Sequence, residues 1–488
     1  MRTHDRRNLE RYLALGIVLA MALAVSACRS PVAPQESAAG ALVLSVDGQE
    51  ARYRAYSVDC QIDLEWVGTA PRSYKLVVEN VMADKTSVSV TDPAGQKDPA
   101  FEVTVKSPTV VEITLKNPSG QRSVSLSPQA GEGTIRFAVL GDSQGRNGIL
   151  GGMIPSMNEE GISFLVHLGD MTPTGAEGEF KAFTDTIAAL EVPYYPVPGN
   201  HDVRTDGLSV FSSKFGPRQH SFDYGGYRFV FLDDSDERLA GDQLEWLDEI
   251  LTGELPTFVF MHVPAVDPRG LDHALLDPSS AQSFMDMVTD PERNVLAVFN
   301  GHVHMFDRRE ESGVLFVTSG GGGAGLYEVP EAGGYHHYTV VDVSGREVTV
   351  TPRRTEVPEI AQDLVLTAQG ATIVLTPEEL YALPAVTAHG SYQNRFGNFS
   401  GAGNYTGVPV RDLLEMVGGM TPEDELVVYA LDGYSQVFAY ENVFPETRGW
   451  EETQGEMVLA ISMDDKKPPE WQDGYRIAFL PSDGEYSN

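Results

Sequence analysis

Cysteine and positive charge are both scarce in this chain. Its 488 residues include only 2 cysteines, too few for a disulfide framework or for a zinc site made of several thiolates. Lysine and arginine number 35 against 70 aspartates and glutamates, which gives a net charge of -35 at pH 7. Because a body this acidic repels phosphate backbones and anionic lipids, we predict no nucleic-acid partner and no membrane docking by charge. Any bound metal must be held by histidine, carboxylate and amide side chains.

One apolar run lies near the N-terminus. Residues 13–27, LALGIVLAMALAVSA, follow four arginines and are too short to span a membrane comfortably, but they suit a secretory signal. The run ends in Val-Ser-Ala before Cys28, which resembles the lipobox of bacterial lipoproteins. The resemblance implies removal of residues 1–27, lipidation of Cys28 and an exported protein anchored to a bacterial membrane, in the periplasm or at the cell surface. The alternative is an uncleaved anchor with an incidental cysteine.

The rest of the chain divides into a tether and three domains. Residues 28–40 are rich in proline, alanine and serine, which predicts a flexible tether. Residues 41–129 show short alternating apolar runs between turn residues, typical of an all-β, immunoglobulin-like sandwich that serves as a spacer or a binding module. Residues 130–356 alternate apolar strands with helical stretches, which predicts an α/β domain. Residues 357–488 have strand, helix and turn signals of their own.

The central domain carries polar residues where its predicted strands end. Ligands of open α/β sheets bind at the carboxyl ends of the strands, so these residues should converge. Each motif alone could be an ordinary turn or a strand-end histidine, but together they combine carboxylates, imidazoles and amides, which suit Zn²⁺, Mn²⁺ or Fe. The five motifs are GDSQ with Asp142 and Gln144, HLGD with Asp170, GNHD with Asn200, His201 and Asp202, FMH with His262, and GHVH with His302 and His304.

This motif set resembles the signature of the calcineurin-like metallophosphoesterases, the superfamily that includes the purple acid phosphatases. The likeness covers about residues 134–354, and HSFDYGGYRFVFLD followed by GDQLEWLDEIL extends it between the third and fourth motifs. It implies a four-layer α/β/β/α sandwich with two metal ions, Mn, Zn or Fe. A hydroxide held between two such ions would attack phosphorus in line.

The resemblance also implies a role for each residue. Asp142 and His304 would bind one metal ion, Asp170 would bridge, and Asn200, His262 and His302 would complete the second ion. His201 would donate a proton to the leaving oxygen or stabilise the phosphoryl charge, with Asp202 orienting its ring. Gln144 stands where many members have a histidine, so it would be a weaker ligand or would bind through water. These roles concern Asp142, Gln144, Asp170, Asn200, His201, Asp202, His262, His302 and His304.

Several cationic side chains lie near the motifs in the sequence. Arg146, Arg204 and His220 could bind phosphate oxygens of a small phosphorylated substrate. Solvated surface charge is the open alternative for each of them.

The C-terminal segment resembles the molybdopterin-binding domain of sulfite-oxidase-like proteins, an α+β fold. The likeness rests on a Tyr405–Pro409 turn, YTGVP, that enters a helix, and on VVYALDGYS, residues 427–435. The segment contains no cysteine to ligate molybdenum, so we expect a ligand-binding or protein-docking use without that metal.

The motifs favour an exported, lipid-anchored phosphoesterase that cleaves phosphomonoesters or phosphodiesters. A non-catalytic surface binding protein with a degenerate metal site is the alternative, and Gln144 is the feature that favours it. A redox enzyme acting through the C-terminal domain is a third hypothesis, which the missing cysteine opposes.

Overall fold

The computed structural model describes residues 33–67, 70–98, 100–129, 134–355, 364–368, 371–393, 399–429, 435–468, 471 and 475–481. The predicted signal peptide and the lipidated Cys28 lie outside these residues, as does most of the DGYS sequence at 432–435. Within the described part of the chain, no helix combines the length and apolarity needed to cross a membrane.

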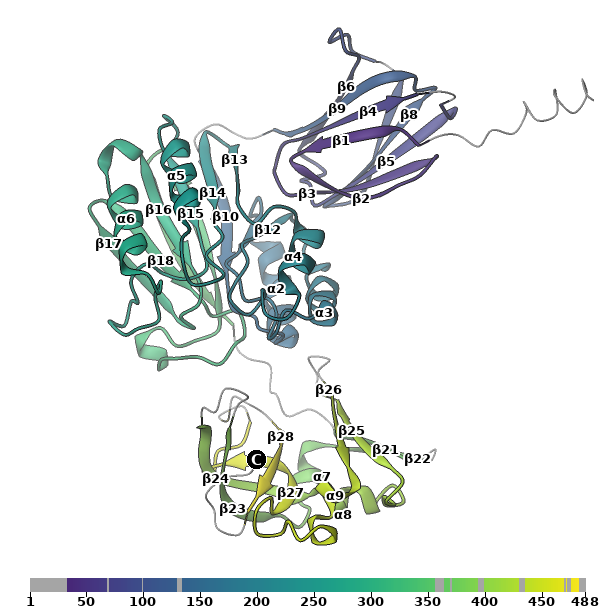
Figure 1. The fold of residues 1–488 in the computed structure, drawn as a ribbon, viewed down its shortest axis with the longest axis vertical. Helices are drawn as coiled ribbons and strands as arrows, with labels where there is room; N and C mark the ends of the chain where they lie inside the picture. The colour runs from purple at the N-terminus through teal and green to yellow at the C-terminus, as the bar shows by residue number, and fades with distance from the viewer. Residues whose placement is uncertain are drawn as a thin grey trace, which may run out of the picture.

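The N-terminal domain is a sandwich of two sheets (Figure 1). Alternating apolar residues of both sheets, among them Tyr53, Ile62 and Val124, form its buried core. Most neighbouring strands run antiparallel, but β3 and β5 pair in parallel. One sheet has the order β1 (Gln35–Ala39), β4 (Cys60–Trp66), β9 (Gly120–Pro128), β6 (Thr86–Thr91), and the other β2 (Ala41–Val46), β3 (Glu50–Ala55), β5 (Ser73–Glu79), β8 (Val110–Lys116), β7 (Phe101–Ser107).

The prediction of a flexible tether over residues 28–40 was wrong for its second half. Residues 35–39 form β1, which pairs antiparallel with β4 from Gln35 opposite Glu65 to Ala39 opposite Gln61. The Tyr53 hydroxyl donates a hydrogen bond to the Glu36 carboxylate, and Ala38 packs against the core. The Gln-Glu-Ser-Ala-Ala sequence has a weak preference for the β conformation, so its pairing with β4 stabilises this strand.

Two further sheets face each other in the central domain. Most strands of these two sheets carry apolar residues on both faces, because each sheet is covered on both sides. The first has the order β12 (Tyr194–Pro196), β11 (Leu165–His167), β10 (Thr134–Leu140), β19 (His337–Ser344), β20 (Glu347–Arg354). The second has the order β13 (His220–Tyr224), β14 (Tyr227–Phe231), β15 (Thr257–Phe260), β16 (Val295–Asn300), β18 (Val314–Ser319), β17 (Phe306–Glu311).

Helices cover the outer faces of both sheets (Figure 1). Phe137, Phe164, Phe229 and other aromatic residues fill the space between the sheets. Helices α2 (Asn147–Glu159), α3 (Glu177–Ile187) and α4 (Gly207–Phe215) share a core with the first sheet, and α5 (Gly241–Ile250) and α6 (Pro278–Val288) share one with the second. This is the α/β/β/α layering expected from the sequence. Short 3-10 turns span Pro291–Arg293 and Pro330–Ala332.

The sandwich contacts the central domain through buried groups. The Asn80 side chain donates to the Tyr194 carbonyl at 3.0 Å and accepts from the Tyr194 N–H at 2.9 Å. The Arg54 guanidinium lies 4.4 Å from the centre of the Tyr194 ring. Val58 and Met82 of the N-terminal region belong to the core between the two central sheets. The two domains are therefore joined by a shared apolar core as well as by hydrogen bonds.

The C-terminal region combines strands and short helices around cores of its own. The prediction of a turn at Tyr405–Pro409 was wrong. These residues end the strand β24, where Tyr405 pairs with Met463, and the helix α8 follows directly. Val410 and Leu413 of α8 are buried, as its apolar pattern predicts. The elements are β21 (Leu364–Ala368), β22 (Ala371–Leu375), α7 (Pro377–Tyr381), β23 (Val386–Gln393), β24 (Phe399–Pro409), α8 (Val410–Glu415), β25 (Glu425–Tyr429), β26 (Ser435–Ala439), α9 (Tyr440–Val443), a 3-10 turn (Pro445–Thr447), β27 (Glu456–Met463) and β28 (Arg476–Leu480).

Candidate metal centre

The five sequence motifs follow the carboxyl ends of five parallel strands. The strands β10, β11 and β12 are parallel neighbours in one sheet, and β15 and β16 are parallel neighbours in the other. Strands that run the same way bring their following loops to the same edge of a sheet. The motif loops therefore meet where the two sheets face each other.

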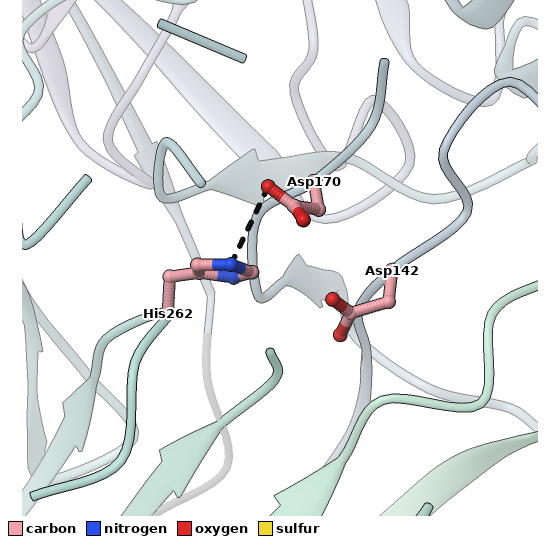
Figure 2. Close-up of side chains that lie close together, drawn as sticks. All are labelled: Asp142, Asp170 and His262. Carbon is pink, nitrogen blue, oxygen red and sulfur yellow. Dashed lines mark ion pairs between the residues drawn. The ribbon is translucent and has the colours of Figure 1, made fainter. Parts of the chain in front are cut away.

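Two carboxylates and an imidazole lie at the centre of this meeting point (Figure 2). One ligand atom each of Asp142, Asp170 and His262 lies within 4.8 Å of the others, and all three residues are buried. The His262 Nε2 atom is 3.4 Å from Asp170 Oδ1. Atoms that share a tetrahedral metal ion at about 2.1 Å are about 3.4 Å apart, so this spacing matches two ligands of one ion.

Three more predicted ligands extend the cluster. His304 Nε2 lies 3.4 Å from Asp142 Oδ1. On the other side, His302 Nδ1 and Asn200 Oδ1 lie 3.3 and 3.1 Å from His262 Nε2. His304 thus lies beside Asp142, and Asn200 and His302 lie beside His262.

Main-chain carbonyls orient the imidazoles. The Nδ1 atoms of His262, His304 and His201 lie 2.7, 2.6 and 2.8 Å from the carbonyl oxygens of Leu168, Gly325 and Pro173, respectively. A carbonyl oxygen only accepts, so each Nδ1 carries a hydrogen and each Nε2 faces the cluster. Such hydrogen bonds fix the tautomer and the direction of metal-binding histidines.

The backbone is held in an unusual conformation at the ligands. Asp142, Gln144, Asp170 and His302 have φ values of 64°, 40°, 56° and 64°, in the left-handed region that costs non-glycine residues energy. Strain of this kind persists where the surrounding structure compensates for it, typically at functional sites. It turns the side chains of successive loops toward one another.

Glycines allow the loops to approach the carboxylates. A Cβ atom on Gly199 would lie 2.2 Å from Asp170 Oδ1, and one on Gly301 would lie 2.5 Å from Asp142 Oδ2. No side chain fits in either space, so the glycines of GNHD and GHVH are required by the packing of the site.

The electrostatics of the cluster call for positive charge. Burial raises the pKa of Asp142 and opposes charge on His262, yet the carboxylates, chiefly Asp170, raise the pKa of His262 to about 10. Burial would also raise the pKa of Asp170, but His262 and His201 outweigh it and lower that pKa. Two buried carboxylates this close are costly unless a cation compensates them. The imidazole and carboxylate donor set therefore fits a divalent or trivalent metal ion.

Gln144 lies with the cluster but contacts it as a donor. Its Nε2 atom is 2.9 Å from Asp170 Oδ2 and 3.4 Å from His304 Nε2. In this orientation the amide donates to a carboxylate, which differs from the expected ligand role.

The predicted role of Asp202 was wrong in its contacts. Its carboxylate accepts hydrogen bonds from the N–H groups of Met171, Thr172 and Gly199 and from the Thr172 hydroxyl, and is fully buried. The His201 ring is held instead by the Pro173 carbonyl. Asp202 thus joins the loop after β11 to the loop after β12 by accepting from backbone N–H groups of both. These bonds hold its carboxylate in place of a bond to the His201 ring.

The three expected substrate contacts lie in different places. Arg204 Nη1 is 3.1 Å from His201 Nδ1, at the site. Arg146 precedes α2 and is exposed. The His220 prediction was wrong: its ring stacks on Phe231 at 4.4 Å and contacts Tyr56 of the sandwich at 5.7 Å, and both of its ring nitrogens are buried.

Two acidic residues of the site, Asp234 and Glu237, were not predicted from the sequence. Asp234 is fully buried and accepts from the N–H groups of His262 and Val263 at 2.8 and 2.7 Å. Burial raises its pKa to about 7. Glu237 accepts from Asn200 Nδ2 at 3.2 Å. The acidic run after the strand FVFL, residues 229–232, is the signal that would have indicated them.

Comparison with known proteins identifies the central domain. Residues 135–306 match the family described as calcineurin-like phosphoesterase, the same family that the motifs resemble. The chain is 26% identical over 167 residues to a 3′,5′-cyclic-nucleotide phosphodiesterase of Nostoc, covering 32% of this chain and 62% of the relative. It is 29% identical over 170 residues to a probable glycerophosphodiester phosphodiesterase of Arcobacter nitrofigilis, covering 32% and 61%. The chain thus spans about three fifths of the length of these curated relatives.

Two solved phosphatase structures align with parts of this chain at low similarity. A purple acid phosphatase from yellow lupin aligns with a TM-score of 0.39 and 14% identity, over 65% of this chain and 72% of that one. A dimetal phosphatase from Danio rerio aligns with a TM-score of 0.36 and 18% identity, over 45% and 98%. The family match and the names of the curated relatives support a hydrolase of phosphoric esters.

Proposed function

We propose that this protein is an exported, lipid-anchored phosphoesterase with two metal ions that hydrolyses phosphoric esters of small molecules. The observation that carries the proposal is the convergence of Asp142, Asp170 and His262 within 4.8 Å, from three loops that the sequence separates widely. Their charge and burial call for cations, and the matched family supplies the reaction class.

The ligands divide into two groups around Asp170. Asp142 and His304 would hold one ion, and Asn200, His262 and His302 the other. Bound ions would activate water as a nucleophile and neutralise charge on the phosphoryl group. Asp234 and Glu237 hold the backbone and the amide of two of these ligands, so the geometry is set before substrate binds.

His201 and Arg204 are the polar groups placed to act on the substrate. The His201 Nε2 atom is 3.9 Å from Asp170 Oδ2, and the Pro173 carbonyl keeps it pointing toward the cluster. From there it can move a proton at the leaving oxygen or stabilise phosphoryl charge. Arg204, beside it, adds a cation that binds phosphoryl oxygens.

A phosphodiester is the substrate that the relatives favour. Both curated relatives described above are named as phosphodiesterases. Export and anchoring rest on the apolar run and the lipobox-like sequence before Cys28. Replacement of Cys28 by serine should release the protein from the membrane fraction and abolish incorporation of labelled fatty acid.

The test uses residues 29–488, purified without chelator. We expect about two metal ions per chain and faster turnover of bis(p-nitrophenyl) phosphate than of p-nitrophenyl phosphate in Mn²⁺, Zn²⁺ or Fe. Asn200→Ala should lower metal content, whereas His201→Ala should keep the metal and lower kcat by about 10²- to 10⁴-fold. His389→Ala, which removes an exposed histidine from β23, is the matched control and should change neither.

The same measurements distinguish the phosphoesterase from the alternative, a non-catalytic surface binding protein. A protein that binds fewer than two metal ions under every condition, and turns over neither ester, would be a surface binding protein. The feature of the site that favours this alternative is Gln144, whose amide donates to Asp170.

A further inference from the structure

Two loops form a border beside the metal ligands His302 and His304. The first spans residues 264–276 and the second residues 325–333. The His273 ring of the first loop lies 5.4 Å from the His302 ring, and it lies at the same distance from Tyr327 of the second loop. Tyr327 stacks on His304 with ring centres 4.1 Å apart. The two loops therefore meet each other and touch the metal ligands on one side of the site.

Exposed hydrophobic side chains of the central domain are concentrated in these loops. Residues 134–355 expose six large hydrophobic side chains, and five of the six belong to the two loops. Leu271 and Val329 are 61% and 59% exposed, although leucine and valine are usually buried. We call these five residues the apolar rim: Val266, Leu271, Leu276, Tyr327 and Val329.

Buried polar contacts hold the rim in place. The Asp267 carboxylate accepts from Arg269 Nε and Nη2 at 3.1 and 2.9 Å, and from the His273 N–H at 3.1 Å. The Arg269 guanidinium lies 5.2 Å from the centre of the Tyr327 ring. The ion pair lies within the first loop, where its side chains are at most 11% exposed, and Arg269 links that loop to Tyr327 of the second. The backbone that carries the rim is therefore held by polar contacts.

The rim is also tied to the ligand shell. The Leu276 N–H donates to the Glu237 carbonyl, and the Glu237 carboxylate holds Asn200. At the other end Arg309 of β17 donates to the Val266 carbonyl. A surface fixed to the reaction centre at several points can position the part of a substrate that does not react.

We propose that the apolar rim binds the organic group of the substrate, and that this group is hydrophobic: an alkyl chain or an aromatic ring attached to the phosphoryl oxygen. The inference rests on the proposed function, since it assigns the phosphoryl group to the metal centre. The exposed rings of His273 and Tyr327 stand nearest the ligands, and the aliphatic residues lie farther along the same loops. A small ester can thus contact rings and aliphatic side chains while its phosphoryl group stays at the metals.

The size and charge of the surroundings favour a small molecule over a macromolecule. The rim has five side chains. A stable protein interface takes about 20 to 30 residues, or about 800 Å², from each partner. The net charge of -35 opposes association with an anionic lipid surface. The ring contacts put Tyr327 of the rim beside His304, and they put His273, from the loop that carries three other rim residues, beside His302.

The test measures binding of three phosphonates to the metal-loaded chain, residues 29–488, by titration calorimetry. Methylphosphonate, hexylphosphonate and phenylphosphonate share one head group and differ in the organic group. We expect hexyl- and phenylphosphonate to bind at least about 10-fold more tightly than methylphosphonate. The double variant Leu271→Ser/Val329→Ser should remove most of this preference and leave the Kd of methylphosphonate unchanged. Leu208→Ser on α4, which alters the sixth exposed hydrophobic residue, is the control and should keep the preference.

The outcomes separate the inference from the proposed function. Equal affinity for all three phosphonates in the unchanged protein would overturn the inference and leave the phosphoesterase standing. Failure to bind any of them would overturn both. A preference that survives in the double variant would overturn the role of the rim, as would equal phosphonate affinities together with rim-dependent binding to phosphatidylcholine vesicles, which would assign the rim to a lipid surface.

Discussion

The two domains that flank the central domain relate to it in different ways. The N-terminal sandwich contributes Val58 and Met82 to the core between the central sheets, and Asn80 bonds to both polar groups of the Tyr194 backbone. The buried clusters of the C-terminal region are drawn from its own residues, between Leu364 and Leu480. The sandwich thus shares a buried core with the central domain, whereas the described core clusters of the C-terminal region contain only residues of that region.

The largest expected effect comes from removing each flanking domain in turn. Deletion of residues 28–129 should lower the Tm of the central domain by more than about 10 °C, because it uncovers apolar core and unpairs the Tyr194 backbone. Deletion of residues 357–488 should change that Tm by less than about 2 °C. Differential scanning calorimetry of the two truncated chains checks this, and equal shifts would contradict the distinction.

A smaller effect is expected from a single amide at the interface. Asn80→Ala leaves a buried N–H and a buried carbonyl of Tyr194 without their partner, which should cost about 3 kcal/mol of unfolding free energy. The matched variant Asn442→Ala removes an amide that bonds to Ala439 and Gln454 in the C-terminal region. Urea unfolding followed by domain-specific proteolysis should show the first variant destabilising the central domain and the second destabilising only its own region.

The smallest effect concerns pH at the same interface. Burial lowers the pKa of His220 to about 4, below its ordinary value of 6.5. The unfolded chain therefore takes up this proton first, so the contribution of neutral His220 is complete above pH 6.5 and is lost as the pH falls toward 4. His220→Phe keeps a ring to stack on Phe231 and should flatten this part of the stability curve by about 1 kcal/mol. An unchanged slope between pH 6.5 and 4 would show that another group carries it.

The sequence was informative where chemistry and local pattern coincide. The motif residues follow apolar strands directly, so knowing that parallel strands share an edge is enough to bring Asp142, Asp170 and His262 together. The layers of the central domain follow from the alternation of strands and helices in the same way.

Contacts between distant segments could not be predicted in this way. Asn80 and His220 each contact a residue of the other domain, Tyr194 and Tyr56 respectively, and neither contact can be read from the sequence around them. Asp202 stands one residue from His201, yet its described hydrogen bonds come from backbone N–H groups of two loops and from the Thr172 hydroxyl. Residues 35–39 form a strand because β4 offers an edge, which their own composition does not indicate.

The bond between Asn80 and Tyr194 has a consequence for self-association. Tyr194 begins β12, the edge strand of its sheet, and the amide of Asn80 occupies the N–H and carbonyl that a further strand would use. Open edges of this kind let sheets of separate molecules join and aggregate. The sandwich therefore covers hydrogen-bonding groups of an edge through which two copies of the central domain could otherwise add strand to strand.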